Sequence, residues 1–245
     1  MARHYRLLTL IVGVFLLGTL PAGAQAINID LGGEGSLTNS SLLLIAGITL
    51  LSLAPGIAIM VTCFPFIVTV LSILRQAMGL QQSPPNMLIV SLALFLTWYI
   101  MEPTFMASYQ AGIEPLIAGS IDMITAFERG VEPFRIFMAG RVDPDTFSQL
   151  SALRDGVAFE GEIRTAPLSM LVPSFMLSEI TRAFEIGFLV FLPFLIIDLV
   201  VSAILMSMGM MMVPPAVVAL PFKLAFFVVA NGWVLLSGAL VRSYS

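Results

Sequence analysis

The sequence predicts an all-α fold of hydrophobic helical hairpins, with four apolar segments after a signal peptide and a mostly helical extracytoplasmic insertion. Of the 245 residues, 58% are hydrophobic and only 11% are charged, whereas average soluble domains carry roughly 25% charged residues. The apolar residues lie in long uninterrupted runs, and no alternating strand pattern persists. The chain is therefore built for lipid or for burial inside a larger assembly.

Residues 1–24 have the three parts of a secretory signal peptide. Arg3 and Arg6 give a positive start, Leu7–Leu20 is mostly apolar, and small residues offer a cleavage site after position 24, or after position 26 as the alternative. The apolar run is short for crossing about 30 Å of hydrocarbon, so a cleaved peptide is favoured over an uncleaved anchor helix. Cleavage would remove His4, the single histidine.

Residues 25–101 are predicted to form the N-terminal hydrophobic helices. Gly35–Leu74 contains no charge for 40 residues, and Pro55 and Pro65 within it indicate a kinked helix or a tight helical hairpin. Gln76–Met101 is also uncharged. Both segments are long enough to span a bilayer.

Residues 186–245 are predicted to form a C-terminal hydrophobic helical hairpin with a Met-rich loop. Ile186–Phe222 carries a single charge, and a Gly209–Pro215 break divides it. Leu224–Val241 is the last apolar segment. Apolar character on all faces of these segments is typical of buried or membrane-embedded helices.

Residues 102–185 form the one region of ordinary polarity, with twelve acidic residues and six arginines. Amphipathic helix patterns are visible within it. A signal peptide sends the mature N-terminus across the membrane, so this acidic region is expected on the extracytoplasmic side and the Met-rich loop on the cytoplasmic side. The loop Arg75–Pro85, which would be cytoplasmic, has one arginine and no acid, whereas residues 102–185 carry a net charge of -6. This difference agrees with the positive-inside rule.

Composition and motifs exclude most enzymes and nucleic-acid binders. Catalysis by Ser/His/Asp or Cys/His needs a histidine, which the mature chain would lack, and no glycine-rich phosphate-binding motif is present. Cys63 lies in an apolar run and is interpreted as a small buried side chain. No basic patch is interleaved with aromatic residues. No catalytic residue, metal site, cofactor or nucleic-acid partner is therefore predicted.

The stretch Ile204–Pro215 (ILMSMGMMMVPP) places methionines at a turn, where polar residues are usual. Three interpretations stay open on the residues alone: ordinary core packing, which this pattern favours, a Cu(I) site of thioether ligands, and a deformable plug that closes a pore. The candidate plug residues are Met206, Met208, Met210, Met211 and Met212, and the candidate hinge residues are Gly209, Pro214 and Pro215.

Two groups of charges are candidates for special roles. Asp198 lies in the middle of an apolar segment, where a charge costs about 2.5–3.5 kcal/mol on insertion scales, so it is expected to face a partner or a cavity. Lys223 is the natural partner, as a structural buried pair. Glu179, Arg182 and Glu185 are spaced to share one side of a helix, which fits either a subunit contact or a surface ion-pair ladder.

Three long blocks of the sequence resemble the FliP family of flagellar type III export-gate proteins. They are Val172–Pro215 (VPSFMLSEITRAFEIGFLVFLPFLIIDLVVSAILMSMGMMMVPP), Arg75–Pro103 and Leu220–Tyr244. The stretch Phe134–Ile163 is shorter and more divergent than expected of the family, and Asn231 stands where an acidic residue is usual.

The resemblance implies a non-enzymatic pore subunit. In that family several copies form a ring, a pentamer, with FliR and FliQ in the export apparatus of the bacterial inner membrane and flagellar basal body, and unfolded flagellar proteins pass through. The resemblance assigns the pore-closing gasket to Met210, Met211 and Met212, with Met206 and Met208 just before it. It also implies that the apolar helices lie largely above the bilayer plane. A transporter or channel for ions or small solutes is the alternative, with a copper-handling protein behind it.

Overall fold

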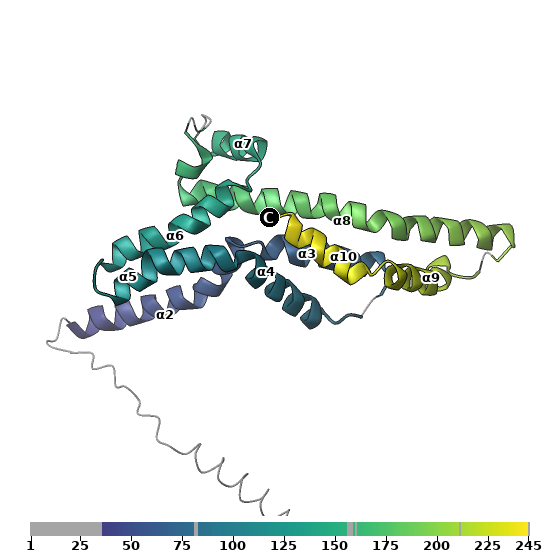
Figure 1. Ribbon diagram of the computed structural model, residues 1–245, viewed down its shortest axis with the longest axis horizontal. Helices are drawn as coiled ribbons and strands as arrows, with labels where there is room; N and C mark the ends of the chain where they lie inside the picture. Colours follow the sequence, from purple (N-terminus) through teal and green to yellow (C-terminus); the bar gives the residue numbers. More distant parts are fainter. Residues whose placement is uncertain (1–35, 81–82, 156–158, 160, 211, 245) are drawn as a thin grey trace, which may run out of the picture. The chain divides into compact units, whose positions relative to one another are not determined.

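The computed structural model describes residues 36–80, 83–155, 159, 161–210 and 212–244 of the chain (Figure 1). The predicted signal peptide lies outside the described residues. Every regular element that the described residues form is a helix, which confirms the all-α prediction. The elements are α2 (Ser36–Met60), α3 (Phe64–Ala77), α4 (Asn86–Ser108), a π-helical turn (Tyr109–Ile113), α5 (Glu114–Ile117), α6 (Met123–Ala139), α7 (Pro144–Asp155), a 3₁₀ turn (Ile163–Thr165), α8 (Leu168–Ser207), α9 (Pro215–Val229) and α10 (Gly232–Arg242).

The chain divides after Ser52 into two units. Of the first unit, the structure describes the part of α2 that covers residues 36–52, and the described side chains there are exposed. The second unit, Leu53–Ser245, holds all the features discussed below.

The predicted break in the first apolar segment lies between α2 and α3. Pro55 is accommodated inside α2, whereas Pro65 lies in the first turn of α3. A proline is tolerated in a first turn because its missing N–H would have no partner there. The segment is thus two helices, and the second proline marks the beginning of α3.

The main hydrophobic core surrounds α3, which packs most extensively against α8. Gly187 of α8 allows the two helices to approach closely, because a Cβ at this position would lie 2.3 Å from Ile73 Cδ1. The fully buried side chains of α3 include Phe66, Ile67, Val70, Leu71 and Leu74. Helices α4 and α10 add Ala93, Met101, Leu236 and Leu240 to the same cluster.

Helices α4 and α8 both run past the ends that the sequence pattern predicted. The charged Glu102 and the following Pro103 do not end α4, because Glu102 is exposed and the helix continues through the π-helical turn to Ile117. Similarly, α8 begins at Leu168, long before Ile186, and its 40 residues make a rod of about 60 Å. Each predicted boundary of the polar region therefore falls inside a continuous helix.

Two of the helices in the described part of the chain are each long and apolar enough to cross a membrane, Asn86–Ile117 and Leu168–Ser207. The number rises to four if each of two bent helix pairs counts as one span. One such pair is α9 and α10, which meet at an angle of 61°.

The last two apolar segments are divided differently from the prediction. The sequence pattern placed Lys223 between the apolar segments Ile186–Phe222 and Leu224–Val241, but it lies in the middle of α9. The actual break is at Asn231, whose φ of +50° is a left-handed conformation that asparagine tolerates better than most residues. The helix stops here because of backbone conformation, and the charge at Lys223 is accommodated by a partner.

A second, smaller cluster joins α6, α7 and the beginning of α8 around Met138, Phe147 and Phe175. Asp143 directly precedes α7, and its Oδ2 accepts hydrogen bonds from the hydroxyl and the amide of Thr146 at 2.7 and 2.8 Å. These bonds lower the pKa of Asp143 below its ordinary value. Asp143 is thus the N-cap of α7.

Candidate functional site

The Met-rich segment begins with a defined helix end. Gly209 has a φ of +73°, and its N–H donates to Met206 O at 3.1 Å, while the N–H of Met210 reaches back to Leu205 O at 3.0 Å. This pair of bonds is a Schellman motif, which requires a left-handed residue just past the helix, usually glycine. The end of α8 is therefore set by Gly209, and Pro214 and Pro215 begin α9 on the other side.

The methionines of this segment lie on its surface. Met206 belongs to α8, and Met208 caps it. Their exposed fractions are 60% and 66%, those of Met210 and Met212 are 42% and 97%, and Met211 lies outside the described residues. The four described side chains are thus not core of this chain, which was the interpretation that the residue pattern alone favoured.

An apolar groove of about 500 Å³ lies beside the segment, between α8 and α9. All its lining residues are apolar, and Met208 and Met210 form the end nearest the loop. The floor of the groove rests on a small cluster in which Val201 and Leu205 of α8 pack against Ala219 of α9. Helix α9 runs back alongside the far part of α8 in Figure 1, so the loop is carried at the tip of a helical hairpin.

The structure brings Asp198 and Lys223 together inside this hairpin. Lys223 Nζ lies 2.6 Å from Asp198 Oδ2 and donates a second hydrogen bond to the carbonyl oxygen of Ala77 at 3.0 Å. Ala77 is the last residue of α3, where the helix dipole favours a cation. Asp198 Oδ1 is buried and has no hydrogen-bond partner in the described part of the chain. Lys223 therefore joins α9 to both α8 and α3.

Glu179, Arg182 and Glu185 do not share one exposed side. The side chain of Glu179 is completely buried, whereas Arg182 keeps 37% of its side-chain surface and Glu185 is exposed. Arg182 Nη1 lies 4.0 Å from Glu179 Oε1. The partners of Glu179 belong to this chain, whereas Arg182 and Glu185 keep exposed side-chain surface.

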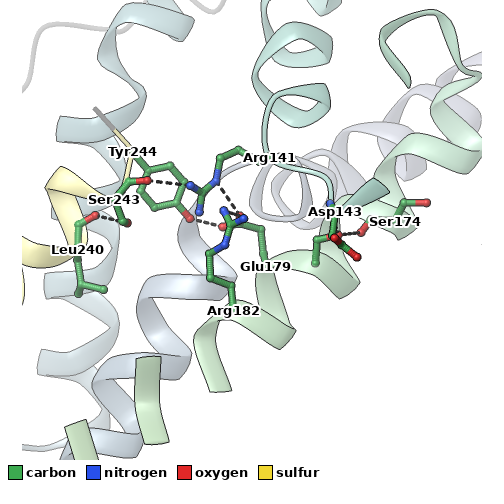
Figure 2. Close-up of polar contacts among 9 residues, drawn as sticks. Arg141, Asp143, Ser174, Glu179, Arg182, Leu240, Ser243 and Tyr244 are labelled. Carbon is green, nitrogen blue, oxygen red and sulfur yellow. Dashed lines mark hydrogen bonds and ion pairs between the residues drawn. The ribbon is translucent and has the colours of Figure 1, made fainter. Parts of the chain in front are cut away.

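Arg141 and Tyr244 complete the surroundings of Glu179, and sequence reasoning missed both (Figure 2). Arg141 Nε donates to Glu179 Oε1 at 3.0 Å, Arg141 Nη1 donates to Ser243 O at 2.8 Å, and the Tyr244 hydroxyl donates to Glu179 Oε2. Local patterns carry no signal for contacts this far apart in the sequence. The one available hint was Glu179 itself, which the sequence groups with Arg182 and Glu185 as charges beside a long apolar segment.

These groups form packing contacts and ion pairs. Within the described ranges, no three His, Cys, Asp or Glu side chains lie close enough together to hold a metal ion. Glu179 and Asp198 are each paired with a cation of the same chain, and the described methionines at the tip of the hairpin are exposed.

Comparison with known proteins identifies the family of this chain. The model of the FliP family matches residues 47–240. The chain belongs to the FliP family. It is 51% identical over 234 residues to the flagellar biosynthetic protein FliP of Caulobacter vibrioides, covering 92% of this chain and 85% of that relative. It is 45% identical to the FliP of Rhizobium meliloti, over 98% of this chain and 99% of the relative. The FliP of Bacillus subtilis is 40% identical over 90% of this chain.

Proposed function

We propose that this protein is a non-enzymatic subunit of the flagellar protein export apparatus, in which it lines a pore for unfolded flagellar proteins. Membership of the FliP family and the names of its relatives, flagellar biosynthetic proteins, support the flagellar role. The finer proposal, that the Met-rich segment closes the pore, is supported by the position and exposure of its methionines.

The observation that best supports the proposed seal is the exposed apolar tip of the α8–α9 hairpin. Soluble proteins seldom leave a contiguous apolar surface uncovered, so such a surface marks an interaction site. Methionine is unbranched and polarizable and repacks around varied surfaces. A ring of such tips excludes water by dewetting when closed and yields to a passing chain. Gly209 and the Pro214–Pro215 pair confine this adaptability to the loop and leave both helices regular.

The large apolar surface of the single chain supports assembly with other subunits. Exposed side chains on α4 and α8, such as Phe95, Trp98, Phe188 and Leu199, require lipid or protein partners. We propose a ring of several copies, a pentamer by family resemblance, with FliQ and FliR, in the bacterial inner membrane at the flagellar basal body. We propose that the chain is inserted by a cleaved signal peptide and that residues 102–185 are extracytoplasmic.

A transporter for ions or small solutes is less well supported. The four apolar segments and Asp198 are the features of the sequence that favour it, but the Asp198 carboxylate is paired with Lys223, and Lys223 also binds a helix end. This arrangement favours a structural role for the pair over that of a proton or ion carrier.

The proposal is tested by replacing Met210, Met211 and Met212 with alanine in a motile host. The matched control replaces Met87 and Met123, two exposed methionines elsewhere in the chain. We expect the loop variant to leak ions or small molecules while export of flagellar proteins is largely retained, and the control variant to stay tight. Unchanged permeability of the loop variant contradicts the seal, and a growth defect that depends on copper supports copper handling instead.

A further inference from the structure

Glu179 is a fully buried carboxylate whose two oxygens are both occupied by groups from distant parts of the chain. Oε1 accepts from Arg141, in the turn after α6, and Oε2 accepts from Tyr244, which follows α10. Figure 2 shows these side chains converging on Glu179 from different elements. A buried carboxylate is tolerated only when it is paired and its lone pairs are satisfied. The network therefore depends on every donor being in place.

Tyr244 makes more contacts in this network than a hydroxyl donor needs. The guanidinium of Arg141 lies over its ring, 4.0 Å from the centroid, a cation–π contact. The ring meets Phe66 of α3 edge-on at 5.5 Å and stacks with Phe137 of α6 at 6.0 Å. Tyr244 is thus held by an apolar wall on one side and by the charged pair on the other.

We propose that Tyr244 is a positioning residue, whose hydroxyl completes the hydrogen bonding of the buried Glu179 carboxylate and thereby fixes α10 against α8 and the turn after α6. The neighbouring contact strengthens the attachment, because the carbonyl oxygen of Ser243 accepts from Arg141 Nη1. Two consecutive residues after α10 thus bind the same buried ion pair, one through the backbone and one through the side chain.

The hydroxyl matters separately from the ring. Phenylalanine would keep the aromatic contacts but would leave Glu179 Oε2 without its donor in a water-poor site, and an unsatisfied buried acceptor is strongly unfavourable. Burial, and next the negative charge of Glu179, raise the pKa of Tyr244 far above its ordinary value. The phenol therefore stays protonated, and a donor, at any pH that a cell meets.

The network also attaches α10, which follows the α8–α9 hairpin, to α8. Helix α10 carries Leu236 and Leu240 into the main core, and α9 joins it through the left-handed Asn231. Fixing the residues after α10 to Glu179 closes a loop of structure from α8 through α9 and α10 and back to α8. This role of Tyr244 goes beyond the proposed function, since it concerns the folding of the chain and needs no pore.

A double-mutant cycle of Tyr244→Phe and Glu179→Gln tests the proposal, with Tyr109→Phe at a half-exposed tyrosine as the control. Purified proteins in mild detergent are unfolded by denaturant. We expect Tyr244→Phe to lower the ratio of folded to unfolded protein about 10- to 100-fold, as for lost hydrogen bonds to charged groups, and Tyr109→Phe to leave it within about 2-fold. In the Glu179→Gln background, Tyr244→Phe should lower the ratio by less than about 3-fold.

Equal losses in both backgrounds would show that the hydroxyl does not act through Glu179, and a Tyr244→Phe protein as stable as the Tyr109→Phe control would overturn the proposal outright. Should Glu179→Gln fail to fold, amide hydrogen exchange of Tyr244→Phe alone decides. Exchange in Gly232–Arg242 should then be at least about 10-fold faster than in the control, and unchanged exchange overturns the proposal. Neither readout uses export or permeability, so the outcome is independent of the proposed seal.

Discussion

The two ends of the long helix α8 present opposite chemistry. Near its beginning, Glu179 is a charged group that is completely buried, and each of its oxygens has a partner in the chain. Beyond its end, Met212 is an apolar group that is 97% exposed. A buried charge demands defined geometry, whereas an exposed methionine adapts to whatever covers it. One end of α8 is therefore suited to fixing the fold and the other to meeting changing partners.

Asp198 lies between these ends and has intermediate properties. Its side chain is 33% exposed, and one oxygen binds Lys223 while the other has no partner within the described ranges. If burial and pairing set the energetic importance of each position, substitution of Glu179 should cost the most folding stability. Substitution of Asp198 or its partner should cost less, and substitution of the methionines should cost the least. Unfolding measurements on single variants test this ordering.

The largest effect is expected for Glu179→Ala. It leaves the Arg141 guanidinium and the Tyr244 hydroxyl without their shared acceptor, and breaking a buried ion pair in this way destabilises by about 3–5 kcal/mol. The measurement is denaturant unfolding of the detergent-purified protein. Glu185→Ala is the matched control, because Glu185 lies on the same helix but is exposed, and it should change the free energy of unfolding by less than about 0.5 kcal/mol. Similar losses for both variants would remove the contrast.

A smaller loss is expected for Lys223→Met, which keeps the apolar stem and removes the ammonium group. Asp198 and the Ala77 carbonyl then lose their donor, and an unsatisfied buried acceptor costs about 1–3 kcal/mol. Partly exposed Asp198 is rescued by water, so the loss should stay below that of Glu179→Ala. A loss as large as that of Glu179→Ala would count against the ordering.

The exchanged pair, Asp198→Lys with Lys223→Asp, sharpens this prediction. It should unfold at higher denaturant concentration than either single exchange, because opposite charges face each other again. It should not reach the wild-type value, because the carboxylate of an aspartate at this position offers no proton to the Ala77 carbonyl oxygen. Full recovery would show that the bond to α3 contributes little.

The same contrast explains what the sequence could predict. The apolar runs, the Gly209 and proline break, and the partnership of Asp198 with Lys223 follow from local composition and from the expense of a lone charge in an apolar helix. The ends of α4 and α8 do not, because Glu102 is exposed on a helix that continues, and α8 begins at Leu168 and runs through the charged residues Glu179, Arg182 and Glu185. Local patterns cannot tell an exposed charge on a helix from the end of the helix.

The Glu179 network was beyond sequence reasoning for a different reason. Arg141 and Tyr244 are separated from Glu179 by 38 and 65 residues, and neither stands out in its own segment. Their meeting depends on how α6, α8 and α10 pack, which no periodicity encodes. Asn231 differs, since the Asn231–Gly232 dipeptide is a local turn signal, but it lies within Leu224–Val241, which was interpreted as one apolar segment.

Gly209→Ala tests the helix end that precedes the loop, and a loss of about 1–2 kcal/mol is expected because alanine must adopt a left-handed backbone. Nothing lies near the position that a Cβ would occupy, so the effect is one of backbone conformation alone. Gly56→Ala is the control, because Gly56 is inside α2 with open space around it, and there the substitution should stabilise by about 0.5–1 kcal/mol. Unfolding of both variants gives the two signs, and a stabilising Gly209→Ala would contradict the Schellman motif.

The smallest effect on stability is expected for Met212→Ala, although it lies at the centre of the proposed seal. A side chain that is 97% exposed loses almost no packing when truncated, so the free energy of unfolding of the isolated chain should change by less than about 0.5 kcal/mol. In the assembled export apparatus the same change should raise permeability, because the side chain would there be covered by neighbouring loops. The two measurements separate a contribution to folding stability, expected at Glu179, from a contribution to sealing, expected at Met212. A loss above about 1 kcal/mol in the isolated chain would show that Met212 packs against its own chain, and the loop would then belong with Glu179 as part of the fold.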